Sequence, residues 1–216
     1  MSSLINLASL GAIIFLWGYP VRMWAQDLDA DSTLIQESRN AVWQWGLMGG
    51  LQFSTIEGDL SDQTYIPDFH AGVYTETDIF PPLGFRVELY YAGLGTGFAS
   101  VADSRLKLNY LVLPGMFTYE FRPGITFLLG PYIGYLMKAN DKGDDYKEDI
   151  TESLARIDVG IKIGVYFQVS PVVNLGLAFH RGFINTQSGG RVSTLKQYNQ
   201  AVVFTTSFDM TELIKR

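Results

Sequence analysis

The segment Arg156–Val169, RIDVGIKIGVYFQV, decides the fold. Every odd-numbered residue in it is large and apolar, whereas the even-numbered residues are mostly charged, polar or glycine. Successive side chains of a β-strand point to opposite faces, so this period of two predicts a strand with one apolar face and one polar face. Asp158 and Lys162 then share the polar face.

The same alternation recurs along the rest of the chain. Further strands are predicted, from the clearest pattern to the weakest, at residues 43–53, 85–91, 173–180, 67–76, 106–121, 124–137 and 198–208. Together with the first segment they make eight strands. Several have ten residues or more, which suits the ~9 to 11 residues that a tilted strand needs to cross a bilayer.

The connections between these strands alternate between short and long. Three are tight and contain proline, at residues 78–83, 122–124 and 170–171. Four are long and polar, at residues 54–66, 95–105, 138–154 and 184–197. Outer-membrane barrels combine short periplasmic turns with longer extracellular loops, and their closed sheet leaves no unpaired edge in lipid. The sequence therefore predicts an all-β fold, an eight-stranded antiparallel up-and-down transmembrane β-barrel, over residues 42–208.

A soluble barrel or β-sandwich, with the apolar face turned inward, is the alternative fold. The polar face argues against it, because that face combines many glycines with large charged side chains. The charged residues are Arg86, Glu88, Glu120, Arg156, Asp158 and Lys162. Such a mixture suits a narrow lumen in which side chains from different walls meet. We expect a lumen ion-pair network that fixes the strand register, with a gate or proton path as the alternative role.

Composition narrows the class of protein. The chain has 216 residues, 47% hydrophobic and 18% charged, and it contains no cysteine. This length fits a single domain or barrel, and the apolar content excludes a disordered chain. The lack of cysteine excludes a disulfide scaffold and a cysteine nucleophile. The formal net charge of -6 argues against a nucleic-acid partner, and we predict no cofactor.

The amino terminus has the pattern of a targeting segment. Residues 4–17 are almost uninterrupted apolar sequence, and polarity rises after Ala25. This pattern predicts a signal peptide at residues 1–25, cleaved after Ala25, with an uncleaved membrane anchor as the alternative. Export and a barrel together predict a location in the outer membrane. Residues 26–41 then form a periplasmic amino-terminal segment, and residues 209–216 form a periplasmic tail.

The long connection at residues 138–154 is rich in carboxylates. Its charged residues are Asp141, Asp144, Asp145, Glu148, Asp149 and Glu152 against Lys138, Lys142 and Lys147, a net charge of -3. The order of ligands and glycine differs from that of an EF-hand, so we predict no metal site. We expect a solvated extracellular loop that shares divalent ions with anionic lipopolysaccharide or docks another protein. The predicted partners are outer-membrane lipid, lipopolysaccharide and envelope proteins.

An enzymatic role would have to use His70 or His180, the only histidines. A catalytic base needs a nucleophile and an orienting carboxylate within reach, and no local spacing secures such a group. The glycine run at residues 93–97 lacks the third glycine of a dinucleotide fingerprint, because Phe98 stands there, and we expect a strand end and loop. We predict that the protein is no enzyme, with a barrel-type lipid A or phospholipid hydrolase or a small conductance as the alternative.

Six short segments carry a family resemblance, at residues 46–54, 69–74, 87–91, 109–114, 129–135 and 160–167. In order and spacing they resemble the PorT-like outer-membrane β-barrel domain family, over residues 40–208. The resemblance implies an eight-stranded outer-membrane barrel of Gram-negative bacteria. Most members lack an assigned activity, and PorT serves protein secretion, so a structural or accessory role in secretion or envelope assembly is expected. Three features depart from the family pattern: Val112, where glutamate is frequent, the eight-residue tail after Phe208, and the lack of Lys or Arg before the apolar run at residues 4–17.

Overall fold

The computed structural model of the protein describes residues 43–59, 62–98, 104–143, 147–186 and 196–215. All of them belong to one compact unit, Arg39–Arg216. The predicted signal peptide and the segment 26–41 lie outside the described residues. Within the described part of the chain, no helix is long and apolar enough to cross a membrane.

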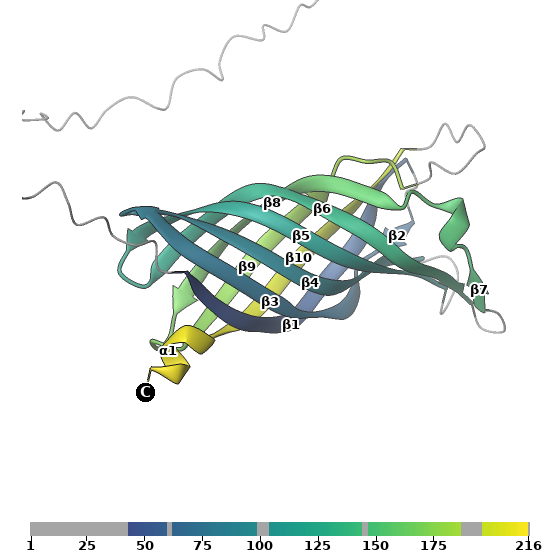
Figure 1. Ribbon diagram of the computed structural model, residues 1–216. Helices are drawn as coiled ribbons and strands as arrows, with labels where there is room; N and C mark the ends of the chain where they lie inside the picture. The colour runs from purple at the N-terminus through teal and green to yellow at the C-terminus, as the bar shows by residue number, and fades with distance from the viewer. Residues whose placement is uncertain (1–42, 60–61, 99–103, 144–146, 187–195, 216) are drawn as a thin grey trace, which may run out of the picture. The chain divides into compact units, whose positions relative to one another are not determined.

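Eight long strands form the fold (Figure 1). They are β1 (Gln44–Gly58), β3 (Ile66–Phe80), β4 (Leu83–Phe98), β5 (Arg105–Arg122), β6 (Ile125–Lys142), β8 (Ile157–Gln168), β9 (Val173–Gly182) and β10 (Gln197–Asp209). Each pairs antiparallel with the next one along the chain, and β10 pairs with β1, which closes the sheet into a barrel. The prediction of an eight-stranded up-and-down barrel is confirmed.

The two ends of the barrel differ in their connections. At the tight-turn end, β3 joins β4 through Pro81-Pro82, β5 joins β6 through Pro123 and Gly124, and β8 joins β9 through residues 169–172. Gly124 has a φ of 82°, a left-handed conformation that favours glycine over other residues. The opposite, long-loop end carries three short elements: β2 (Gln63–Thr64), β7 (Lys147–Asp149) and the 3-10 helix η1 (Thr151–Ser153).

Several strands extend further into the long connections than predicted. β1 continues to Gly58, β4 to Phe98 and β6 to Lys142. The glycine run 93–97 was expected to be a strand end and loop, but all of it lies in β4 and pairs with residues 105–109 of β5. Cross-strand hydrogen bonding at this place outweighs the low strand propensity of glycine, because strand propensity depends strongly on context.

The apolar face of the strands points outward and the mixed face points into the lumen. Phe117, Ile133 and Ile163 on the outer wall are 61%, 54% and 53% exposed. Tyr90 and Tyr110, on the other face, are each 1% exposed. A soluble barrel would show the reverse distribution, whereas a wall of exposed apolar side chains is the surface that lipid covers.

The carboxy-terminal tail forms a short helix, α1 (Met210–Ile214), at the tight-turn end beside the start of β1 (Figure 1). Asp209 caps the helix by accepting a hydrogen bond from the backbone nitrogen of Glu212 at 3.0 Å. The hydroxyl of Thr211 accepts a hydrogen bond from the backbone nitrogen of Trp45 at 2.9 Å. The tail is therefore an ordered element attached to the first strand.

Candidate functional site

Charged side chains from different walls meet inside the barrel. Glu88 on β4 accepts a hydrogen bond from Nε of Arg86 at 2.9 Å and another from Nζ of Lys162 on β8. Arg86, Glu88 and Lys162 are 3%, 0% and 1% exposed. Because β5 and β6 separate β4 from β8 along the sheet, the contact between Glu88 and Lys162 crosses the lumen.

Glu76 on β3 adds a second carboxylate and balances the charge. Nη1 of Arg86 donates to this carboxylate at 3.0 Å. The guanidinium also lies 3.6 Å from the ring centroid of Tyr74 and 4.7 Å from that of Tyr166. We call Glu76, Arg86, Glu88 and Lys162 the central ion cluster. It sets two cations against two carboxylates, which is the arrangement that makes buried charge tolerable.

Asp158 belongs to a separate polar group on the same face of β8. Its Oδ2 accepts hydrogen bonds from the hydroxyl of Tyr132 at 3.1 Å and from Nδ2 of Asn199 at 2.9 Å. Nδ2 of Asn199 also donates to the hydroxyl of Tyr110 at 3.2 Å. Neutral donors thus hold this buried carboxylate, so Asp158 is a lumen residue but not a member of the central ion cluster.

Two of the six predicted lumen charges lie outside the lumen. Arg156 is exposed at the long-loop end, where Nη1 donates to the carbonyl of Leu136 at 3.5 Å. Glu120 is exposed at the tight-turn end and accepts a hydrogen bond from the backbone of Gly124 at 3.4 Å. The prediction is wrong for both because alternation holds only within a regular strand. Arg156 precedes β8, and the register of β5 shifts just after Glu120.

Sequence reasoning missed Glu76, Tyr74 and the partners of Asp158. The signal for β3 was weak, although Tyr74, Glu76 and His70 share the parity of one strand face. For Tyr132 and Asn199 the missing information was the register between distant strands, which no local pattern contains. Val112, the departure from the family pattern, is a buried lumen residue that is 2% exposed.

The two histidines are buried lumen residues with hydroxyl partners. Nε2 of His70 lies 3.1 Å from the hydroxyl oxygen of Thr205, and Nε2 of His180 lies 3.1 Å from that of Tyr90. The ring of His180 also stacks on Tyr132, with centroids 5.3 Å apart. In both of these contacts the partner of the histidine is a hydroxyl and not a carboxylate, and the absence of enzymatic activity stays a prediction. Ser188, which lies in the long connection after His180 and would be a candidate nucleophile, is outside the described residues.

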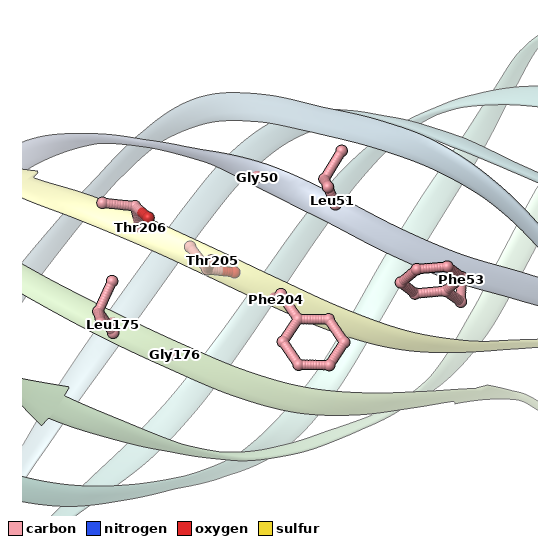
Figure 2. A pocket seen from close by; sticks show the side chains of 8 residues that line it. All are labelled: Gly50, Leu51, Phe53, Leu175, Gly176, Phe204, Thr205 and Thr206. Atoms are coloured by element: carbon pink, nitrogen blue, oxygen red, sulfur yellow. The ribbon is translucent and has the colours of Figure 1, made fainter.

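A depression of about 520 Å³ lies on the outer wall, where β1, β10 and β9 run side by side (Figure 2). It is lined by Gly50, Leu51, Phe53, Leu175, Gly176, Phe204, Thr205 and Thr206. Figure 2 shows Leu51, Phe53 and Phe204 around it, and no titratable side chain lines it. This hollow is therefore part of the surface that faces hydrocarbon, and it lies apart from the central ion cluster.

The predicted acidic loop is partly built into strands. Asp141 lies in β6, Glu148 and Asp149 form most of β7, and Glu152 lies in η1. Asp144 and Asp145 lie outside the described residues. The Asp149 carboxylate accepts hydrogen bonds from the hydroxyl and, at 3.1 Å, the backbone nitrogen of Thr151, and these bonds lower its pKa. Among the described residues, no three histidine, cysteine or acidic side chains gather as metal ligands would.

Comparison with known proteins places this geometry in a family. The model of the "Outer membrane protein beta-barrel domain" family matches residues 24–188. Among solved structures, Neisserial surface protein A is similar with a TM-score of 0.52 and 12% identity, over 77% of this chain and 97% of that one. The attachment invasion locus protein of Yersinia pestis, Ail, is similar with a TM-score of 0.47 and 11% identity, over 77% and 98%.

No curated protein matches the chain. The likeness to Neisserial surface protein A is a likeness of fold, because the sequences share only 12% identity. The family match covers most of the chain and agrees with the closed barrel and its outward apolar face. The protein therefore belongs to the outer membrane protein β-barrel domain family and is an outer-membrane β-barrel protein.

Proposed function

We propose that the protein is a closed scaffold of the outer membrane, a structural or accessory component that works through its two ends. The observation that carries this proposal is the central ion cluster, in which Arg86 and Lys162 both bind Glu88. An ion passing along the lumen would have to separate these buried charges, and an unpaired buried charge is strongly unfavourable. The filled lumen therefore favours a role in which partners bind at the rims.

Aromatic side chains fill the lumen next to the cluster. The ring centroid of Tyr90 lies 5.0 Å from Nζ of Lys162, and its hydroxyl contacts His180 at 3.1 Å. The ring of Tyr132 stacks on the ring of His180. The side chains of Tyr90, Tyr132 and His180 are all buried. In an eight-stranded barrel the interior is only wide enough for side chains to fill it. This packing supports a rigid scaffold.

We extend the proposal to a role in protein secretion or envelope assembly, which the resemblance to the PorT-like family suggests. Exposed apolar side chains on α1 support a docking role at the tight-turn end: Leu213 is 49% exposed and Ile214 is 70% exposed. The long loops supply a second surface at the opposite end. The expected partners are other proteins of the cell envelope.

Photo-crosslinking in native membranes tests the accessory role. A photoreactive residue at Ile214 should give a discrete protein adduct, whereas the same residue at the lipid-facing Phe117 should not. The double variant Leu213→Ser/Ile214→Ser, purified without crosslinking in mild detergent through a tag between residues 26 and 41, should no longer co-purify with the protein that the wild type retains and that the crosslink at position 214 identifies. Identical adducts at both positions, or none at Ile214, would contradict docking through α1.

Planar bilayer recording tests the closed lumen independently. The purified wild-type barrel should give no steady current, because the central ion cluster blocks the lumen. A reproducible ohmic conductance from the wild-type protein would contradict the scaffold and favour a small conductance. Variants of Glu88 are unsuitable as the primary test here, because loss of the barrel fold would also produce leakage.

A further inference from the structure

Strands β5, β6 and β7 pair at the long-loop end, where β4 also pairs with β5. We call the part built by β5, β6 and β7 the flap, and Figure 1 shows it at one end of the barrel. The register aligns Arg105 of β5 with Lys142 of β6 and Lys147 of β7. One row nearer the barrel, Lys107 aligns with Asn140 and Asp149. A third row aligns Asn109 with Lys138. Directly paired residues point to the same face of a sheet, so these three rows share one face.

This register separates the charges of the acidic segment 138–154 onto two faces and places its lysines beside Arg105 and Lys107 of β5. The shared face carries five cations, which we call the cationic face: Arg105, Lys107, Lys138, Lys142 and Lys147. Asp68 lies 3.4 Å from Lys107, and Asp149 lies 3.9 Å from Lys138. Asp141 and Glu148 pair with each other one position away and therefore point to the opposite face.

The cationic face continues the outer wall of the barrel. Below Asn109 and Lys138, the same strands present the exposed apolar residues Leu111 and Tyr135, which pair with each other. A bulge between Asn109 and Tyr110 leaves both Met137, 48% exposed, and Lys138, with 53% of its side chain exposed, at this boundary. Lys107 and Lys138 thus stand where the hydrocarbon-facing surface ends.

We propose that the cationic face binds the phosphate groups of lipid A, the anchor of lipopolysaccharide in the outer leaflet. Barrels of this class carry their long loops on the outside, so the face lies at the level of the outer-leaflet headgroups. Lysine and arginine form charge-assisted hydrogen bonds with phosphate oxygens, and their aliphatic stems lie along apolar surface. Continuity with the lipid-covered wall favours a membrane lipid over a soluble anion.

The proposal needs no protein partner and is independent of the docking role of α1. If crosslinking at α1 fails while lipid binding holds, only the accessory role is lost. If lipid binding fails while crosslinking succeeds, only the cationic face loses its assignment.

Binding of defined lipids to the full mature chain in neutral detergent tests the proposal. The probe is synthetic bisphosphorylated lipid A, and the reference ligand is the same lipid without its phosphates. The variant Lys138→Gln/Lys142→Gln removes two charges from the cationic face. Its matched control, Arg122→Gln/Lys215→Gln, removes two charges from the tight-turn end and leaves the same net charge.

The wild type should prefer the phosphorylated lipid, and this preference should weaken as salt rises. The test variant should bind it about tenfold more weakly, as expected for the loss of two exposed charge contacts, while the control variant should bind like the wild type. Equal losses in both variants would overturn the proposal, because only net charge would then matter. Equal binding of the dephosphorylated lipid, or of glucose 1-phosphate as a soluble phosphate, would also overturn it.

Discussion

Two ion pairs of the same chemistry lie in opposite surroundings. In the lumen, Lys162 and Glu88 are 1% and 0% exposed. On the flap, Lys138 and Asp149 are 53% and 56% exposed, and their charged atoms lie 3.9 Å apart. A buried charge depends on its partner because little else solvates it, whereas water replaces the partner of an exposed charge. The first pair therefore belongs to the fold, and the second leaves its lysine available to a ligand.

Removing the shared carboxylate should have the largest effect. Glu88→Ala leaves Arg86 and Lys162 buried without their common partner, so the free energy of unfolding should fall by about 3 to 5 kcal/mol. Urea unfolding of the barrel in detergent measures the change. Lys138→Ala, which breaks the exposed pair, is the matched control and should leave the unfolding midpoint unchanged. An unchanged midpoint for Glu88→Ala would mean that the lumen cluster does not stabilise the fold.

Replacing the whole lumen pair should recover much of this loss. In Glu88→Leu/Lys162→Met, Arg86 keeps Glu76 at 3.0 Å, so no buried charge is left without a partner. We expect the double variant to be more stable than Glu88→Ala by about 2 kcal/mol or more in the same urea experiment. If the double variant is the less stable of the two, the loss in Glu88→Ala does not arise from unpaired charge.

Two glycines allow the packing on the two faces of the wall to be compared: Gly130 faces the lumen and Gly115 faces outward. A Cβ at Gly130 would lie 2.1 Å from the backbone oxygen of Gly115 and 2.6 Å from Cα of Met116. A Cβ at Gly115 would meet only Phe85, at 3.4 Å. Gly130→Ala should therefore destabilise the barrel by about 1 to 3 kcal/mol, and Gly115→Ala by no more than about 0.5 kcal/mol. Thermal unfolding of both variants in the same detergent measures the two effects, and equal effects would contradict this explanation.

The smallest effect concerns the pH response of the flap. Hydrogen bonds from Thr151 lower the pKa of Asp149 below its ordinary value of 3.8. Because the pKa is lower in the folded state, the stabilisation that these hydrogen bonds give the flap is complete above pH 3.8 and is lost as the pH falls through the lowered pKa. Hydrogen exchange at the Thr151 amide should therefore accelerate, relative to Asp149→Asn, only below pH 3.8. If the ratio of the two exchange rates, wild type to Asp149→Asn, were the same at every pH, the Asp149 carboxylate would be excluded as the cause of the pH response.

The strands, and the face of each strand that points to lipid, were predictable from sequence because the alternation of apolar and polar residues is a local pattern. The outward residues of a membrane strand are predominantly apolar, so Ile157, Ile161 and Ile163 show the period without any knowledge of neighbouring strands. The placement of Glu88 and Lys162 on the lumen face follows from the same alternation. Their contact with each other does not, because it depends on the register of four strands.

The ends of the strands were less predictable than their centres. In the sequence, Arg156 and Glu120 continue the alternation of polar and apolar residues. In the structure, both lie at strand ends, where their side chains are exposed. The acidic composition of residues 138–154 likewise concealed the cationic face. Pairing between β5, β6 and β7 sorts its charges onto two sides, and a count of charges contains no information about sides.

The bond between Thr211 and Trp45 joins residues 166 positions apart. It lies beside the pairing of β1 with β10. This pairing brings the most distant parts of the chain into contact, and contacts between residues far apart in sequence form slowly. Through this hydrogen bond, helix α1 ties the end of β10 to the start of β1. Because α1 directly follows β10, this hydrogen bond requires β10 to pair with β1 in the native register.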